Sequence, residues 1–316
     1  MRTGIFSMRL RVLGWALSCT VGGGAVWLSA APVPQQVFRA TTDLVTVGVT
    51  VSGKNGLAVQ GLSREDFEVR EDGVPQPLSY LATGDSQESA PPLHLGLMFD
   101  TSGSMADDIH LARTAAIKFL NTLTEAVDIT LVDFDTEVRA GRFTQADFPR
   151  LVERIRNRKP QGFTAMYDAL GVYLDTSSGD DGRTVLVIFT DGGDTRSSIP
   201  FGEALTLVRA SDVTVYAIGF LPRRTSGPQG EGRARLSQLT AESGGEAFFP
   251  TSMTQIEEAF ARIAAQVQSQ YTLGYTSTNT ARDGRWRKLE VRVRRPDTRS
   301  ATVRARRGYF APFVKQ

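Results

Sequence analysis

The feature that most constrains the fold is a regular alternation of short apolar segments with helical patterns across the middle of the chain. Mostly apolar segments occur at residues 93–99, 127–134, 184–189, 213–220 and 246–249. Patterns typical of helices lie between and after them, at residues 105–123, 148–156, 165–174, 201–210, 235–243 and 253–268. Such an order favours a mostly parallel sheet with helices on both faces. We therefore predict an α/β fold for residues 93–268, with a small antiparallel hairpin at residues 135–143.

Strand patterns flank this region on both sides. On the N-terminal side, residues 44–51 alternate with strand period, residues 62–69 lead into a turn at 71–73, and a further strand is expected at 77–81. On the C-terminal side, strands are expected at 271–275, 286–293 and 301–310. Because the C-terminal strands are too short to fold alone, we expect them to pair with the N-terminal ones in a flanking β module.

These patterns divide the chain into four parts. They are a leader (1–31), an N-terminal β module with a polar linker (32–92), the α/β domain (93–268), and C-terminal strands packed with the N-terminal module (269–316).

The first 31 residues have the pattern of a secretory signal peptide. Arg9 and Arg11 precede an apolar stretch at 12–28, which is followed by Ser29, Ala30 and Ala31. A lipoprotein signal at Cys19 and an uncleaved membrane anchor are the alternatives. Apart from the leader and a possible lipid anchor at Cys19, no sequence pattern predicts membrane association. The leader indicates a periplasmic, cell-surface or secreted protein.

Composition supports an exported globular protein with no nucleic-acid partner. The apolar fraction is 41% and the charged fraction is 22%, which are ordinary values for a folded domain. The chain has 36 basic and 34 acidic residues, and since three of the basic ones lie in the leader, a mature chain has a net charge of about −1. Cys19 is the single cysteine, so removal of the leader leaves no disulfide, as is common in bacterial envelope proteins.

Hydroxyl and carboxylate side chains gather where the apolar strands end. Asp100, Ser102 and Ser104 follow the first strand as an Asp-x-Ser-x-Ser run, Asp191 follows the strand at 184–189, and Thr164 lies in the segment between them. Open α/β sheets bind ligands at the carboxyl ends of their strands. Oxygen ligands of this kind suit a hard cation, above all Mg²⁺, with Mn²⁺ or Ca²⁺ as alternatives.

The five side chains, in this order, resemble the metal-ion-dependent adhesion site of von Willebrand factor type A domains. The resemblance covers residues 93–268 and implies a Rossmann-like fold. Both flanks also resemble an acidobacterial set of exported proteins related to these domains, through a GL-x-x-x-DFEV-x-EDG stretch at Gly61–Gly73 and a Y-x-LGY…R-x-GYF pattern at Tyr271–Phe310. One departure from the family pattern is Phe163, which stands where a second glycine is common.

The resemblance implies that Ser102, Ser104 and Thr164 supply hydroxyl ligands and that Asp100 and Asp191 supply carboxylates, directly or through water. Neutral hydroxyls leave the cation under-neutralised, so it can accept a carboxylate from a protein ligand. The implied function is exported, metal-dependent binding or adhesion. The alternative is an envelope scaffold in which the metal only stabilises loops.

In the family, the final helix can shift and alter the metal site. Residues 253–268 hold that position, with Ile256, Phe260 and Ile263 as the expected buried face. A plain packing helix is the simpler interpretation.

Other chemistry finds little support, and we do not expect an enzyme. Neither His94 nor His110 lies in a metal-ligand or catalytic pattern. Metal-assisted hydrolysis needs a general base and a lid, and neither is evident. Residues 282–307 are strongly basic, but alternation with valine at 291–294 indicates a strand with a solvated outer face.

Overall fold

The computed structural model describes residues 44–313, apart from residues 55, 85–90, 222–226 and 299. The expected leader with Cys19 and most of the expected linker lie outside the described residues. Within the described part of the chain, no helix is both long and apolar enough to cross a membrane.

A six-stranded sheet forms the centre of the α/β domain, in the order β10-β9-β8-β5-β6-β7. All neighbouring strands are parallel except β7, which runs antiparallel to β6 at the edge. The predicted α/β fold and its edge hairpin are thereby confirmed. The strands are β5 (Leu93–Asp100), β6 (Ala126–Phe134), β7 (Val138–Phe143), β8 (Arg183–Thr190), β9 (Thr214–Gly219) and β10 (Ala247–Phe248).

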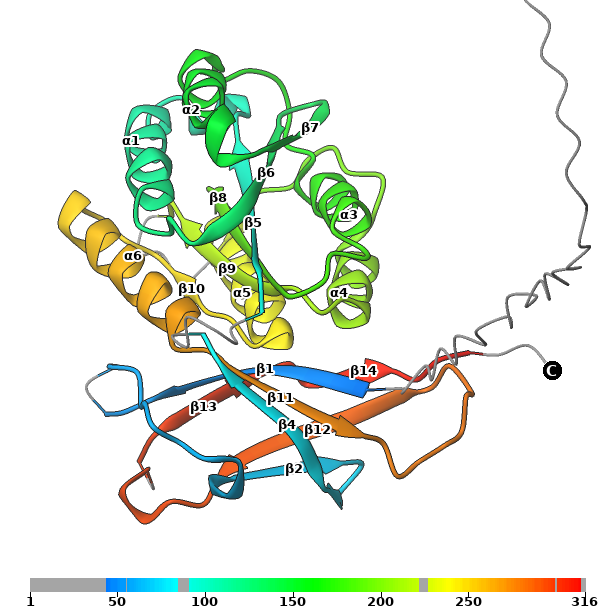
Figure 1. Ribbon diagram of the computed structural model, residues 1–316. Coiled ribbons are helices and arrows are strands. Elements are labelled where there is room, and N and C mark those ends of the chain that lie inside the picture. The colour runs from blue at the N-terminus through cyan, green and yellow to red at the C-terminus, as the bar shows by residue number, and fades with distance from the viewer. Residues whose placement is uncertain (1–43, 55, 85–90, 222–226, 299, 314–316) are drawn as a thin grey trace, which may run out of the picture. The chain divides into compact units, whose positions relative to one another are not determined.

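Helices cover both faces of this sheet (Figure 1). The helices are α1 (Ile109–Leu120), α2 (Phe148–Asn157), α3 (Met166–Thr176), α4 (Phe201–Ala210), α5 (Pro228–Ser243) and α6 (Met253–Gln268). One hydrophobic cluster joins the sheet to α1, α2 and α6, and a second joins its other face to α3, α4 and α5. Because both faces are buried, the central strands carry long apolar runs, as in β8, where every residue is buried and residues 185–189 are all apolar.

Two helices begin at other places than the sequence predicts. A helix was predicted from residue 105, but α1 begins at Ile109, because the preceding residues form a short 3₁₀ turn, η2 (Gly103–Met105), and a loop. In contrast, α5 begins at Pro228, seven residues earlier than predicted, with proline at the start of the helix where its missing N–H is tolerated. The predicted buried face of α6 is confirmed, since Ile256, Phe260 and Ile263 are all buried.

The flanking strands form two four-stranded sheets with the orders β13-β1-β11-β4 and β14-β12-β2-β3. Each sheet mixes N-terminal with C-terminal strands, which confirms the composite β module. The two sheets share one core that includes Val47, Val69, Leu273 and Leu289. The strands are β1 (Leu44–Ser52), β2 (Phe67–Glu71), β3 (Val74–Gln76), β4 (Leu78–Thr83), β11 (Tyr271–Thr276), β12 (Trp286–Val293), β13 (Thr302–Ala305) and β14 (Gly308–Phe310).

The N-terminal hairpin differs from the prediction. A single strand at 77–81 was expected to return from the turn, but two short strands follow it. β3 pairs with β2 across Asp72 and Gly73, which both have positive φ (48° and 85°), as the tightest hairpin turns require. After Pro77, which has no N–H to donate, the chain leaves this sheet, and β4 pairs with β11 in the other one.

The basic C-terminal strands are largely charge-compensated within the module. Arg294 pairs with Glu68 at 3.0 Å, Arg287 pairs with Asp283 at 2.9 Å, and Lys288 pairs with Glu290 at 2.8 Å. These pairs agree with a solvated strand face.

A buried carboxylate in this module binds three hydroxyl groups. Glu71, at the end of β2, is 2% exposed. Its Oε2 accepts hydrogen bonds from Tyr275 Oη (2.8 Å) and Tyr309 Oη (2.9 Å), and its Oε1 accepts one from Ser277 Oγ (2.7 Å). Because these partners come from three C-terminal positions, Glu71 ties the N-terminal hairpin to the end of the chain.

We predict that Glu71→Ala lowers the free energy of unfolding by about 3 kcal/mol, since it leaves buried hydroxyl groups without an acceptor. Urea denaturation measures the change. Glu65→Ala is the matched control, because Glu65 is 75% exposed and its carboxylate lies 3.7 Å from the exposed Arg64. Equal stability of the two variants would contradict the role of Glu71.

Candidate metal centre

Asp100 is a fully buried carboxylate at the end of β5. Its Oδ2 accepts a hydrogen bond from Thr190 Oγ1 (2.7 Å), at the end of the neighbouring strand β8, and its Oδ1 accepts one from Ser102 N (2.9 Å). Burial raises the pKa of Asp100 to about 7, although the hydrogen bonds from Thr190 and Ser102 oppose this effect. Among the described residues no cationic side chain forms an ion pair with it, so two neutral donors hold a carboxylate that is costly to ionise.

The two serines of the run lie side by side after this strand. Ser102 is buried, Ser104 is exposed, and their Oγ atoms are 3.1 Å apart. Octahedral coordination at 2.0–2.1 Å places adjacent ligand oxygens about 3 Å apart. The spacing of the two hydroxyls therefore fits neighbouring positions around Mg²⁺.

The loop that carries Thr164 is fixed by backbone hydrogen bonds. Gly103 N donates to Gly162 O (3.1 Å), so the loop packs directly against the serine turn. Gly162 has φ of +69°, and a Cβ there would lie 2.3 Å from Thr136 Oγ1, so this position requires glycine. Thr164 is 3% exposed, and its N–H donates to Thr195 Oγ1 (3.0 Å).

Phe163 changes the surface of this loop and leaves its attachment intact. Its side chain is 62% exposed, while its N–H donates to Thr136 Oγ1 (2.9 Å). The departure from a second glycine thus adds an exposed aromatic ring next to Thr164.

Asp191 brings a second carboxylate to this edge of the sheet. It follows β8, is partly buried, and its Oδ1 accepts a hydrogen bond from Gly193 N (3.0 Å). Its charge adds a smaller contribution to the raised pKa of Asp100, for which burial is the main cause. It also contributes to the raised pKa of Asp108, for which burial and Asp107 are the larger causes. Negative charge therefore accumulates here, as a cation site requires.

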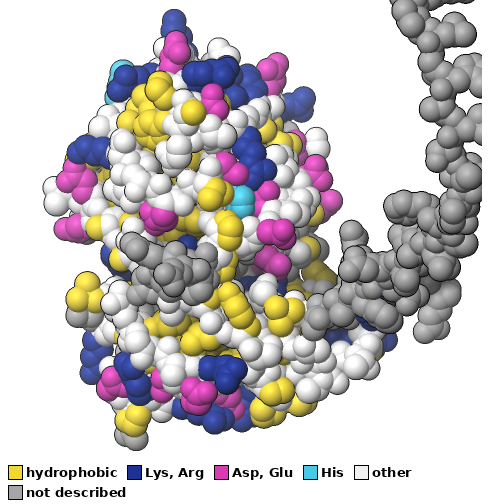
Figure 2. Space-filling view, in the orientation of Figure 1, with side chains coloured by type: hydrophobic (Ala, Val, Ile, Leu, Met, Phe, Trp, Pro, Cys, Tyr) yellow, Lys and Arg dark blue, Asp and Glu magenta, His cyan; other side chains and the backbone are white. Residues whose placement is uncertain are grey.

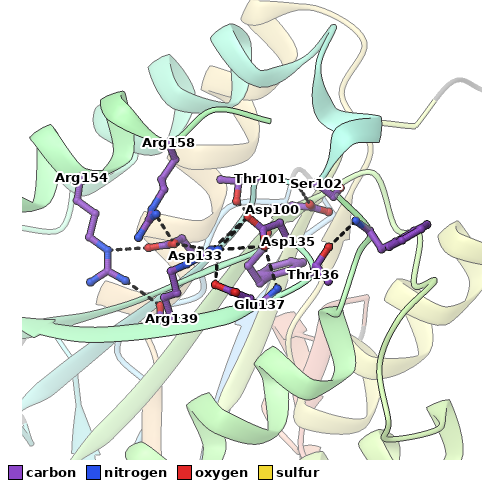
Figure 3. Close-up of polar contacts among 12 residues, drawn as sticks. Asp100, Thr101, Ser102, Asp133, Asp135, Thr136, Glu137, Arg139, Arg154 and Arg158 are labelled. Atoms are coloured by element: carbon purple, nitrogen blue, oxygen red, sulfur yellow. Dashed lines mark hydrogen bonds and ion pairs between the residues drawn. The ribbon is translucent and has the colours of Figure 1, made fainter. Parts of the chain in front are cut away.

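An ion-pair network that the sequence does not predict lies beside these loops (Figure 3). Asp133, buried near the end of β6, binds Arg154 (2.6 Å), Arg158 (2.9 Å) and Arg139 (3.5 Å). Arg139 also pairs with Asp135 at 3.1 Å.

This network connects α2 and β7 to the loops that carry the candidate ligands. The backbone oxygen of Asp135 accepts a hydrogen bond from Ala165 N (2.9 Å), and Thr101 O accepts one from Gln161 N (2.9 Å). Acidic residues on β6 opposite an arginine-rich helix are the available sequence signal. That signal does not say which arginine pairs with which acid.

The structure brings the predicted residues to one edge of the sheet in two groups. Asp100, Ser102 and Ser104 are joined by hydrogen bonds, and Asp191 acts electrostatically on Asp100. Thr164 is connected through the contact between Gly162 and Gly103. Coordination of one ion by all five side chains stays a prediction.

The donor set fits a hard cation and no other common metal chemistry. Within the described part of the chain, no three His, Cys, Asp or Glu side chains lie close enough to hold a metal, which disfavours a zinc-type site. The candidate cluster has two carboxylates and three hydroxyls, so it is not a group of three His, Cys, Asp or Glu side chains. They offer oxygen alone, and a buried carboxylate without an ion pair is the group that a cation would neutralise.

Within the described residues, neither histidine forms a hydrogen bond or ion pair with a candidate ligand. His94 is near the start of β5, six residues before the end of the strand, and its Nδ1 lies 3.1 Å from Asp128 Oδ2. His110 is exposed in the first turn of α1.

Fold and site together define an α/β domain with a carboxylate and hydroxyl cluster at the carboxyl ends of its central strands. The family model of the von Willebrand factor type A domain matches residues 94–262, which is more than half of the chain. The chain therefore belongs to the von Willebrand factor type A domain family. No curated protein sequence matches it.

Solved structures resemble it at low sequence identity. An aerotolerance-related membrane protein from Bacteroides fragilis is 17% identical, with a TM-score of 0.44 over 55% of this chain and 98% of that one. A von Willebrand factor type A protein from Catenulispora acidiphila is 12% identical, with a TM-score of 0.47 over 88% and 76%. The corresponding domain of the type V pilus tip protein Mfa5 from Porphyromonas gingivalis is 14% identical, with a TM-score of 0.45 over 56% and 95%. Likenesses this weak carry no argument about function.

The raised pKa of Asp100 predicts a pH-dependent stability in the absence of divalent ions. An acid whose folded-state pKa lies above its unfolded value destabilises the fold as pH rises from about 4 to 7, after which the penalty stays constant. The expected total loss is of the order of 4 kcal/mol, at about 1.4 kcal/mol per tenfold change in proton affinity, and roughly 3 kcal/mol of it falls between pH 5 and pH 8. Asp100→Asn should remove most of it. Urea denaturation in chelator at pH 5 and pH 8 tests this, and equal pH dependence of both proteins would contradict it.

Proposed function

We propose that this protein is an exported, divalent-cation-dependent binding or adhesion protein that engages a protein or surface ligand at the carboxyl end of its central sheet. Asp100 carries the proposal: it is a fully buried carboxylate without a cationic partner among the described residues, beside two hydroxyls 3.1 Å apart. Family membership supports a binding or adhesion role. It also favours binding over catalysis, because members of this family are mostly non-enzymatic.

Five residues would hold the ion: Asp100, Ser102, Ser104, Thr164 and Asp191. Mg²⁺ is the cation that this oxygen donor set suits best, with Mn²⁺ or Ca²⁺ as alternatives. When bound, the ion supplies a Lewis-acidic position for an anionic ligand. Where the two carboxylates act through water, only neutral hydroxyls would touch the ion directly, and it would keep much of its charge for an anionic ligand.

The ligand in this proposal offers a carboxylate. The exposed side of the cluster is where it would approach, since Ser104 is exposed while Asp100 and Ser102 are buried. The ring of Phe163, 62% exposed next to Thr164, supplies an apolar surface beside the ion. A carboxylate next to an apolar side chain is the ligand chemistry that this surface fits.

Export is part of the proposal and depends on the charged and apolar pattern of residues 1–31. We infer a periplasmic, cell-surface or secreted location.

The metal part of the proposal is tested by isothermal titration of the full chain with Mg²⁺ and Mn²⁺. The wild type should bind one equivalent of metal, and Asp100→Ala should lose at least tenfold in affinity, because it removes the buried carboxylate. Asp297→Ala is the matched control, since Asp297 is 65% exposed and pairs with Arg295 in the β module. Equal metal affinity of Asp100→Ala and Asp297→Ala would contradict the assignment of the metal site.

The ligand part is tested by capture from a cell-envelope extract on the immobilised chain. We expect a protein that is retained in Mg²⁺, released by chelator, and not retained by Asp100→Ala. Retention that is equal in chelator and in the variant would instead favour the scaffold alternative, in which the metal only stabilises the loops.

A further inference from the structure

A cationic cleft lies between α1 and α2, apart from the metal site. Its volume is about 330 Å³. Five of its lining residues come from α1 and one from α2, and none of the six is acidic. They are His110, Arg113, Thr114, Ile117, Lys118 and Arg156.

The spacing of the α1 residues explains how the cleft forms. Positions 110, 113, 114, 117 and 118 recur at three and four residues, so they occupy one side of the helix. The core-facing side of α1 carries Ile109, Ala112, Ala116 and Phe119. The cleft-lining side chains of α1 therefore stand on a helix whose opposite side is packed in the core.

Most arginines around this cleft are already paired, whereas two that line it are not. Arg154 and Arg158 bind Asp133, and Arg150 approaches Asp147 at 3.5 Å. Among the described residues, Arg113 and Arg156 form no ion pair with any carboxylate. Lys and Arg side chains gather over this end of the domain, above α2 (Figure 2).

Arg113 also has an unused hydrogen-bond donor. One terminal nitrogen of its guanidinium donates to the backbone oxygen of Arg158. Its Nε is buried and has no hydrogen-bond partner within the described residues. A buried donor without an acceptor is costly, and an anionic oxygen would satisfy it.

Lys118 contributes less to the charge of the cleft. It pairs with Glu257 of α6 at 2.5 Å. The uncompensated charge therefore belongs to Arg113 and Arg156, with His110 beside them as a further donor when protonated.

We propose that this cleft binds the phosphate or sulfate group of a small organic ligand. Two guanidinium groups from different helices offer more donors than the two oxygens of one carboxylate can accept, whereas a tetrahedral oxyanion has enough acceptors. The cleft is about ten times the volume of one water, ~30 Å³, so it has room for the body that carries the anion. Ile117 provides an apolar surface for that body.

The proposal does not depend on the metal site, since none of the lining residues is a candidate metal ligand. It is tested in chelator by NMR titration of the full ¹⁵N-labelled chain with inorganic phosphate and with glucose 6-phosphate. We expect saturable shifts of the amides of residues 110–118. We expect Arg156→Gln to weaken glucose 6-phosphate binding at least tenfold.

Arg150→Gln is the matched control, because Arg150 lies on the same helix, is 79% exposed, and does not line the cleft. Arg113→Gln is a second variant. Arg113 is partly buried, so its loss could prevent folding. Arg156 is exposed, so Arg156→Gln tests the cleft even in that case. Absence of saturable shifts, or equal affinity of Arg156→Gln and Arg150→Gln, would overturn the proposal.

A separate arm measures retention of the chain on vesicles that contain phosphatidylglycerol, to separate a soluble ligand from a lipid headgroup. We expect no retention that depends on Arg156. Arg156-dependent retention without binding of either soluble phosphate would assign the cleft to a membrane surface and overturn the small-ligand proposal.

Discussion

The buried carboxylate of Asp100 is the interaction on which the arrangement of the candidate site depends. It lies where β5 ends, and Thr190 holds it from the end of β8, so two neighbouring strands must stop in register for the contact to form. The parallel sheet supplies that register through the pairing of β5 with β8, which is apolar from Leu95 with Val185 to Phe99 with Phe189. A hydrophobic core therefore positions a polar group that water would otherwise solvate.

A second layer of polar contacts explains why the loops around Asp100 keep their places. The guanidinium groups on Asp133 attach α2 and β7 to the end of β6, and Asp135 connects that strand end to the start of α3 through Ala165. Glycine at position 162 lets Thr136 lie directly behind the loop that carries Thr164. The rigidity of the site thus comes from residues that are not candidate ligands.

The sequence was sufficient for the architecture because the apolar strands and amphipathic helices repeat over long stretches. It also placed Asp100 and Asp191 correctly at strand ends, since that position follows from strand boundaries alone. It did not predict the support from Thr190 or the pairing of Asp133 with three arginines, because ion pairs between distant segments leave no periodic signal. The division between β3 and β4 was missed for a related reason: the sheet that a short strand joins depends on tertiary partners.

The last helix shows how the hydrophobic core and the site are connected. The ring of Phe260, on α6, packs against Phe119 of α1 at 5.3 Å and against Phe189 of β8 at 6.0 Å. Phe189 directly precedes Thr190, which holds Asp100. A displacement of α6 would therefore disturb the strand end that positions the carboxylate, and it would have to break buried aromatic contacts to do so. In the conformation described, this favours the packing role for α6, because the same contacts that couple the helix to the site also oppose its movement.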